Sequence, residues 1–416
     1  MAALAVLAVL RSFHYGFQTL DLLSHGDAMQ RLLLPVLTCL LVLAAAVPTE
    51  ATVQPAPANN WWVFIGTGTA GKGKGIHRFE LDVAKGTLTN GELAAETPQS
   101  TFLAIHPTNN FLYTVNESGT QDAKAAGKIS AFAVDAKTGK LTALNSQTSG
   151  GPGPAHVAVD REGKNVLAAN YGGGSITCLP IQKDGSLAAP TAFIQHKGGS
   201  KGVKGRQDTP HAHSINVDAA NKFAFVADLG LDKVLIYRFD PAKGTLEPND
   251  PPAFETAKGA GPRHFSFHPN GKFAYVINEL DSTVTAWSYD AAKGTLKPLQ
   301  TLSTLPKPTK GNSTAEVVVH PSGKFLYGSN RGHNSIAVFT INEQTGELTA
   351  TGHQGTDIKT PRNFALDPTG TLMIVANQDG NSLVIFKVDQ KTGELTPHGE
   401  PIAVPRPMCV RFVPKG

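Results

Sequence analysis

The 416-residue chain has few charged residues and few cysteines, and these shortages exclude several classes of protein. Asp, Glu, Lys and Arg make up only 17% of it, and its formal net charge is +4 at pH 7. Because this small excess is spread along the chain without a basic run, we expect no nucleic-acid partner. There are three cysteines, and no Cys/His spacing resembles a zinc site, so we expect no metal.

Two motifs that carry well-known chemistry are also missing. No glycine-rich loop stands between a predicted strand and a predicted helix, so the sequence offers no nucleotide site and no cofactor is expected. No Gly-x-Ser-x-Gly motif opens a helix. A covalent acyl-enzyme is therefore not expected either.

The N-terminal residues 1–55 stand outside the repeated pattern that fills the rest of the chain. Their apolar run, Leu32–Val47, is short for a spanning helix, and the small residues Ala44–Ala46 are typical of a signal-peptide cleavage site. We predict a signal peptide ending near residues 46–55, hence export to the periplasm or the extracellular space. The segment could also include a misassigned extension before Met29, and an uncleaved membrane anchor is the alternative.

Seven copies of one pattern fill residues 56–416. Each copy has a short apolar strand, a turn, a second strand that usually ends in Asn or Asp, a third strand and a turn that contains glycine. These glycines recur about every 51 residues, which is the period of four-stranded propeller blades. The repeated glycines are Gly86, Gly139, Gly185, Gly244, Gly294, Gly346 and Gly393.

The two ends of this region complete one blade. Pro407–Val413 has the character of a first strand with no second strand after it, and Trp62–Gly66 that of a second strand with no first strand before it. Pairing them closes a ring and leaves only short sheet edges. We therefore predict an all-β, seven-bladed β-propeller closed by pairing of the C-terminal strand with the N-terminal blade. Cys178 and Cys409 then fall in non-adjacent blades, so we predict buried, unpaired thiols.

Residues that recur at one position of the repeat are interpreted as serving the blade. His106, His268 and His320 each precede proline in the turn between the first and second strands, where other copies have Asp. Short polar side chains at such a position bond nearby backbone groups. We therefore exclude these histidines from the candidate site.

Polar residues that break the repeat are the candidates for function. First and second strands are antiparallel, so the start of one and the end of the other lie at the same pole. Ionisable residues collect at that mouth of the channel, whereas the other pole shows only turn residues. A concave concentration of such groups shifts pKa values and builds active sites. The residues are His156, His213, Arg263, His264, Glu279, Glu316, Arg331 and Arg362.

Some of these residues also have structural interpretations. The histidines could be packed core imidazoles, and Glu316 could pair with Arg263 or Arg362 to satisfy buried charge. The glycine-rich stretch Lys197–Arg206, in the connection before the fourth blade, is interpreted as a mobile, solvated loop. Its alternative is a loop that hooks over the mouth and attracts an anion.

The segment around Arg263 resembles the lactonase family of seven-bladed propellers. The resemblance rests on Gly259–His264, Phe267–Pro269 and Tyr275–Leu280, and weaker matches run through every blade from about Trp61 onward. The family includes bacterial propeller-type 6-phosphogluconolactonases and is related to fungal carboxy-cis,cis-muconate cyclases. The resemblance implies hydrolysis of a sugar lactone by water attack at the mouth of the channel.

Catalytic roles follow from what lactone hydrolysis requires. Glu279 is predicted to take the proton of the attacking water, with a neutral His156 or His213 as the competing base. Arg263, assisted by His264, is predicted to stabilise negative charge on the carbonyl oxygen.

Substrate binding is assigned to a second group of residues. Arg331 and Arg362 are predicted to hold a carboxylate or phosphate, and Glu316 to orient the arginines. The resemblance adds Tyr171 and Asn330. The expected partner is a small lactone, bound by a monomer that has no stable membrane insertion after signal cleavage. A muconate-type cycloisomerase or lyase, and a non-catalytic binding propeller, remain alternatives.

Overall fold

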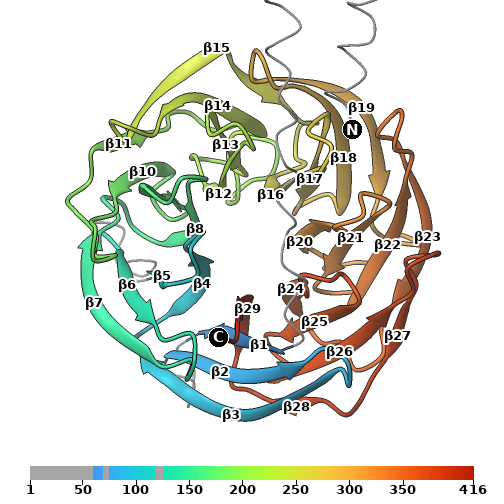
Figure 1. Cartoon of the computed structure of the whole chain (residues 1–416). Coiled ribbons are helices and arrows are strands. Elements are labelled where there is room, and N and C mark those ends of the chain that lie inside the picture. Colours follow the sequence, from blue (N-terminus) through green and yellow to red (C-terminus); the bar gives the residue numbers. More distant parts are fainter. Residues whose placement is uncertain (1–59, 69–74, 118–124) are drawn as a thin grey trace, which may run out of the picture. The chain divides into compact units, whose positions relative to one another are not determined.

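The computed structural model describes residues 60–68, 75–117 and 125–416, and every regular element within them is a β-strand (Figure 1). No helix in these ranges is long and apolar enough to cross a membrane. The predicted signal peptide, residues 1–55, lies outside the described residues.

The strands form seven antiparallel sheets, six of four strands and one of five. The innermost strands are β4 (Ser100–Ile105), β8 (Pro154–Val159), β12 (Ala212–Val217), β16 (Pro262–Phe267), β20 (Thr314–Val319), β24 (Pro361–Leu366) and β29 (Pro407–Pro414). The second strands are β5 (Phe111–Asn116), β9 (Asn165–Asn170), β13 (Phe223–Asp228), β17 (Phe273–Asn278), β21 (Phe325–Asn330), β25 (Leu372–Asn377) and β1 (Asn60–Thr67).

The outer half of each sheet follows the same order. The third strands are β6 (Lys128–Val134), β10 (Ser175–Pro180), β14 (Lys233–Asp240), β18 (Thr283–Asp290), β22 (Ser335–Ile341), β26 (Ser382–Val388) and β2 (Gly75–Asp82). The outermost strands are β7 (Leu141–Thr148), β11 (Ala192–Gln195), β15 (Thr245–Glu255), β19 (Thr295–Ser303), β23 (Leu348–Gln354), β27 (Leu395–Pro397) and β3 (Thr87–Glu96). A short strand, β28 (Ile402–Ala403), also pairs with β26.

The ring closes as the sequence predicts. Each innermost strand contacts the innermost strands of its two neighbours, so the sheets surround a common axis (Figure 1). β29 pairs antiparallel with β1, for example Ile65 with Val410, and completes the sheet that contains β2 and β3. The prediction of an all-β, seven-bladed propeller closed through its two terminal strands is confirmed.

The repeated glycines hold neighbouring blades together. All seven adopt a positive φ, which only glycine enters without a steric cost. At Gly346 an added Cβ would lie 2.4 Å from the ring of Phe273 in the preceding blade. The carbonyl of Gly346 also accepts a hydrogen bond of 3.0 Å from the Tyr275 hydroxyl. The glycine is therefore required both by its turn and by the blade before it.

The His-Pro turns have the structural role that the sequence predicts. His106, His268 and His320 each place Nε2 at 2.8–2.9 Å from the carbonyl oxygen of a glycine in the next blade. In His268 the Nδ1 atom accepts the backbone N–H of Asn270, so Nε2 carries the proton and donates to Gly323. The unpaired thiols predicted for Cys178 and Cys409 are confirmed, since both residues are free and buried.

Replacing His268 by alanine is expected to lower the free energy of unfolding by about 1–3 kcal/mol, because the carbonyl of Gly323 loses its donor in a buried place. Urea unfolding measures this loss, and Lys272→Ala, at an exposed position of the same turn, is the control. The activity of the folded variant should stay at the wild-type level. A His268→Ala protein of normal stability without activity would contradict this assignment.

Candidate active site

Bulges in the innermost strands aim the ionisable side chains. The pairing register shifts between the first and third residues of β8, β12, β16 and β24, so the second residue is extra. That second residue is His213 in β12, Arg263 in β16 and Arg362 in β24. Bulges re-aim side chains next to active sites. The end of the channel at which these strands begin is called the arginine-rich mouth below.

Glu279 lies at the centre of this mouth and contacts three arginines. It follows β17 directly, and its Oε2 lies 3.0 Å from Arg263 Nε and 3.1 Å from Arg331 Nη2. Its Oε1 lies 2.6 Å from Arg206 Nη2. Since Glu279 is 6% exposed and Arg263 only 1%, water screens these charges poorly.

The arginines determine the protonation state of Glu279. Burial alone would raise the pKa of this carboxyl group, but Arg331, Arg263 and Arg206 outweigh burial and lower the pKa to about 2. Both oxygens already accept charged N–H groups. These contacts argue against Glu279 as the proton acceptor, the role that the sequence suggested. It serves better as the anion that gathers the arginines.

Arg206 is a residue that the sequence analysis did not place in the site. Besides Glu279, its Nη2 contacts the hydroxyl of Tyr171 at 3.3 Å. The neighbouring Gln207 is fully buried and bonds the carbonyl of Leu229 at 2.8 Å. The loop that carries Arg206 is thus anchored and reaches the arginine-rich mouth, which favours the alternative interpretation over a free, solvated loop.

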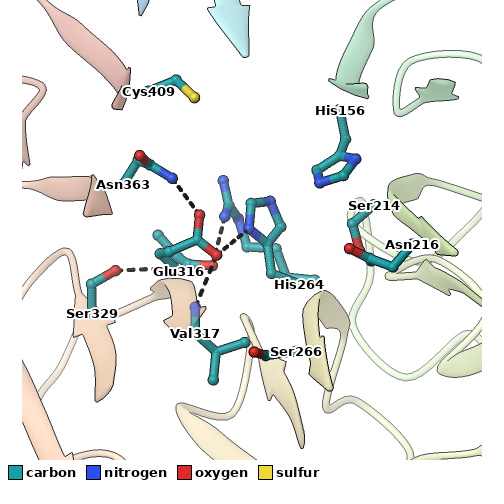
Figure 2. Close-up of polar contacts among 12 residues, drawn as sticks. His156, Ser214, Asn216, His264, Ser266, Glu316, Val317, Ser329, Asn363 and Cys409 are labelled. Carbon is teal, nitrogen blue, oxygen red and sulfur yellow. Dashed lines mark hydrogen bonds and ion pairs between the residues drawn. The ribbon is translucent and has the colours of Figure 1, made fainter. Parts of the chain in front are cut away.

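A second buried carboxylate, Glu316 on β20, lies among neutral donors. Figure 2 shows it pointing toward His264, whose Nδ1 is 2.8 Å from Glu316 Oε1. The backbone N–H of Val317 donates to the same oxygen at 3.0 Å, and the side chain of Asn363 donates to Oε2. Among the described residues no hydrogen bond or salt bridge joins Glu316 to Arg263 or Arg362, so the prediction that it orients the arginines stays a prediction. Its direct side-chain contact is with the imidazole of His264.

The Glu316–His264 pair carries one negative charge, which resides on Glu316. Burial acts to raise the pKa of Glu316, but the contact with His264 lowers it below its ordinary value. Burial also lowers the pKa of His264, although Glu316 opposes the shift. The pair therefore consists of an ionised carboxylate and a neutral imidazole that donates through Nδ1.

Three imidazoles meet at the axis beside this pair. The ring centroids of His156 and His213 lie 5.5 Å and 5.2 Å from that of His264. Burial, and the positive charge of Arg263, lower the pKa of His213 well below its ordinary value. The buried Nδ1 of His213 and Nε2 of His264 have no hydrogen-bond partner within the described residues. Both are buried polar atoms whose hydrogen-bonding capacity the described residues leave unused.

The remaining predicted residues differ in how far they reach the mouth. Arg331 donates to the carbonyl of Thr314 at 2.7 Å as well as contacting Glu279. Arg362 is half-buried, and its one hydrogen bond in the described chain, to Gln378, is long at 3.5 Å. Asn330 is fully buried; it accepts from the hydroxyl of Thr304 and donates to the carbonyl of Thr304, after the preceding blade, and to the hydroxyl of Ser335 in its own blade. These bonds use its amide, so we do not retain it as a substrate-binding residue.

Across residues 60–68, 75–117 and 125–416, no group of three His, Cys, Asp or Glu side chains is arranged to hold a metal ion. The use of water without a metal stays a prediction.

Comparison with known proteins agrees with the fold. A family model described as "Lactonase, 7-bladed beta-propeller" matches residues 62–412. The chain is 38% identical over 351 residues to a 6-phosphogluconolactonase of Bacillus subtilis, covering 84% of this chain and 97% of that protein. It is 38% identical to a 6-phosphogluconolactonase of Formosa agariphila, covering 73% of this chain and 86% of that one.

A solved structure extends the similarity to an exported protein. The periplasmic gluconolactonase of Pseudomonas aeruginosa superimposes with a TM-score of 0.81 at 30% sequence identity, covering 86% of this chain and 100% of that one. The matches span all seven blades. The chain belongs to the lactonase family of seven-bladed β-propellers.

Proposed function

We propose that this chain hydrolyses a sugar lactone at the arginine-rich mouth. The observation that carries the proposal is that His213 and Arg263 are the bulged residues of the neighbouring inner strands β12 and β16, and that burial and the charges of Arg263, Arg362 and Arg331 lower the pKa of the His213 imidazole. A neutral base next to fixed positive charge is what ester hydrolysis by water requires. The relatives described above are lactonases, which supports the same reaction.

In the proposed reaction, a ring nitrogen of the neutral His213 accepts a proton from water while the water oxygen bonds to the lactone carbonyl carbon. The carbonyl oxygen becomes negative, and Arg263 stabilises it. The ring C–O bond then breaks, its oxygen takes the proton from His213, and the hydroxy acid leaves as a carboxylate with its proton passed to solvent. His156 is the other candidate base, since burial also lowers its pKa well below the ordinary value.

The arginines favour an anionic or strongly polar lactone. Arg331 and Arg362 retain N–H groups that can bind a carboxylate or phosphate in bidentate fashion. Tyr171 stacks on His211 with centroids 4.6 Å apart and forms an aromatic wall suited to a sugar ring. We propose the gluconolactone type of substrate, with or without a phosphate.

We also propose that the protein is exported and that it is a monomer. Export is supported by the apolar run Leu32–Val47 and by the periplasmic gluconolactonase of similar structure. A monomer is supported by the described surface, where the exposed large apolar side chains Leu93, Phe193 and Leu299 lie on the outermost strands of three different blades. Scattered single residues do not form an association patch.

The test is a comparison of three substrates with the purified chain that begins at Thr52. Glucono-δ-lactone and its 6-phosphate are assayed by acid release above the spontaneous rate, and carboxy-cis,cis-muconate by its absorbance. Opening of either gluconolactone, without reaction of the muconate, is expected. Conversion of the muconate alone would show that the protein is a cycloisomerase and not a hydrolase. No turnover of any of the three substrates would contradict the proposed function.

The pH dependence of hydrolysis should report a base with a lowered pKa. The base acts when neutral, and the lowered pKa of His213 keeps it neutral at pH values where an ordinary histidine is protonated. We expect kcat/KM to stay level between about pH 8 and about pH 6, with any decline below that range. Initial rates corrected for spontaneous opening measure this profile. An acidic limb centred near the ordinary histidine pKa would exclude the buried histidines as the base.

A further inference from the structure

A cavity of about 330 Å³ lies at the other end of the channel. Its rim includes Pro321 and Pro368, which follow the ends of β20 and β24, so it opens at the pole opposite the arginine-rich mouth. Its inner end is formed by His156, His264 and Glu316. In Figure 2 these three side chains extend toward the axis from different blades. The cavity and the proposed lactone site therefore share this layer of side chains.

Arg411 brings a positive charge to this cavity. The residue lies on β29, is half-buried, and lines the cavity with its guanidinium carbon 4.7 Å from the centre of the Phe102 ring. The sequence analysis expected only turn residues at this pole, and Arg411 shows that this expectation was wrong. Arg411 is the fifth residue of its inner strand, β29. The candidates that the sequence predicts on inner strands stand at the second and third residues.

Most N–H groups of the Arg411 guanidinium have no hydrogen-bond acceptor among the described residues. Within the described chain its single hydrogen bond goes from Nη1 to the carbonyl of Val410 at 2.7 Å, and no salt bridge involves it. A guanidinium has five N–H groups, so most of them remain available. The cation–π contact with Phe102 uses no N–H group, so it leaves these donors available in a residue that lines the cavity.

The carboxylates that line the same cavity are already satisfied. Glu316 accepts from His264, Asn363 and Val317. Asp367 accepts the backbone N–H groups of Thr369 and Leu372 in its turn. Neither forms a salt bridge with Arg411 in the described structure, although Arg411 is near enough to Glu316 to help lower the pKa of that carboxyl group. The N–H groups of Arg411 therefore have no carboxylate bound to them among the described residues.

We propose that this cavity binds a small organic carboxylate, held in bidentate fashion by Arg411. The fork of the guanidinium matches the two oxygens of a carboxylate. The walls that face it are largely apolar and include Val318, Phe364 and Ala365, which suits the carbon body of such a ligand. A volume near the lower end of the range for small-molecule pockets limits the ligand to about the size of a benzoate.

The first test is titration calorimetry of the folded protein with benzoate. Wild-type protein and Arg331→Met, altered at the arginine-rich mouth, are expected to bind it with the same affinity. Arg411→Met, which keeps the length of the side chain and its contact with Phe102, is expected to bind at least about tenfold more weakly. No binding by the wild type, or a loss in Arg331→Met with none in Arg411→Met, would overturn the proposal.

A second variant tests the cavity without touching the arginine. Ala365→Phe adds a ring to the wall, and it is expected to abolish benzoate binding while Arg411 keeps its charge. Unchanged affinity in a folded Ala365→Phe protein would place the benzoate elsewhere and refute the proposal. Gluconate is titrated in parallel with Arg411→Met and Arg331→Met. A dependence on Arg411 identifies a hydrophilic carboxylate as a ligand, and a dependence on Arg331 alone assigns gluconate to the lactone site and leaves the apolar carboxylate as the ligand here.

Discussion

Replacing Glu279 by alanine is expected to lower the free energy of unfolding by about 3–5 kcal/mol, as the removal of one partner from a buried ion pair does. The carboxylate is the shared counterion of Arg206, Arg263 and Arg331. Arg263 is 1% exposed and cannot turn to water when the anion is lost. Repulsion among the arginines then adds to the cost of keeping Arg263 charged in the interior.

Urea unfolding of two further variants makes this measurement specific. Glu247→Ala removes a carboxylate that pairs with Arg238 on the outer strands, where both side chains are more than half exposed, and should cost less than about 1 kcal/mol. Glu279→Gln keeps hydrogen-bond acceptance without the charge and should fall between the two. If Glu279→Ala unfolds at the same urea concentration as Glu247→Ala, Glu279 is not the anion that organises the arginines.

The fold could be predicted because the information that specifies it is local and repeated. Each glycine turn occupies a positive φ, and the residue type alone reveals that requirement. Ring closure followed from the two incomplete strand patterns at the ends, Trp62–Gly66 and Pro407–Val413, which pair as β1 and β29. Because the glycine turn recurs seven times, its pattern is distinguished from a chance match.

The composition of the arginine-rich mouth could be predicted in part. Arg263, His264 and Glu316 stood out because they break the repeat at aligned positions on the inner strands. Arg206 could not be found in this way, because its loop lies outside the repeat and has no equivalent in the other blades. The contact of Arg206 with Glu279 depends on a hydrogen-bond network around Gln207, and no local sequence pattern indicates that network.

The pairing of the charges could not be predicted at all. Arg263 and His264 are adjacent in sequence, yet the bulge in β16 sends Arg263 to Glu279 and His264 to Glu316. Without the bulge, alternation along a strand would still separate the two side chains, but it would not say which carboxylate each one meets. The same geometry holds Glu279 as an anion among the arginines, so the proposed reaction uses a neutral histidine as its base.

Arg263 provides a direct test of the proposed reaction. Arg263 directs Nε to Glu279 and Nη1 to the carbonyl of Ala315, and Nη2 makes no further hydrogen bond within the described residues. This leaves a donor for the oxygen that becomes negative as the lactone is attacked. Burial and the neighbouring Arg331 and Arg362 lower the pKa of Arg263 to about 9, so it remains charged at neutral pH.

Arg263→Met is therefore expected to reduce kcat/KM for lactone hydrolysis by about 10²–10³, the usual effect of removing one donor to an oxyanion. Glu279 keeps Arg206 and Arg331, so the variant should still fold, which circular dichroism and urea unfolding check. Most of the loss should appear in kcat, because the ground-state carbonyl carries little charge. Arg263→Lys retains the charge but not the fork, and should recover only part of the rate. Arg238→Met, on the exposed face of β14, should hydrolyse lactone as the wild type does. A folded Arg263→Met protein with wild-type kcat would show that negative charge develops elsewhere, and the arginine-rich mouth would then be a substrate-holding surface and not the centre of the reaction.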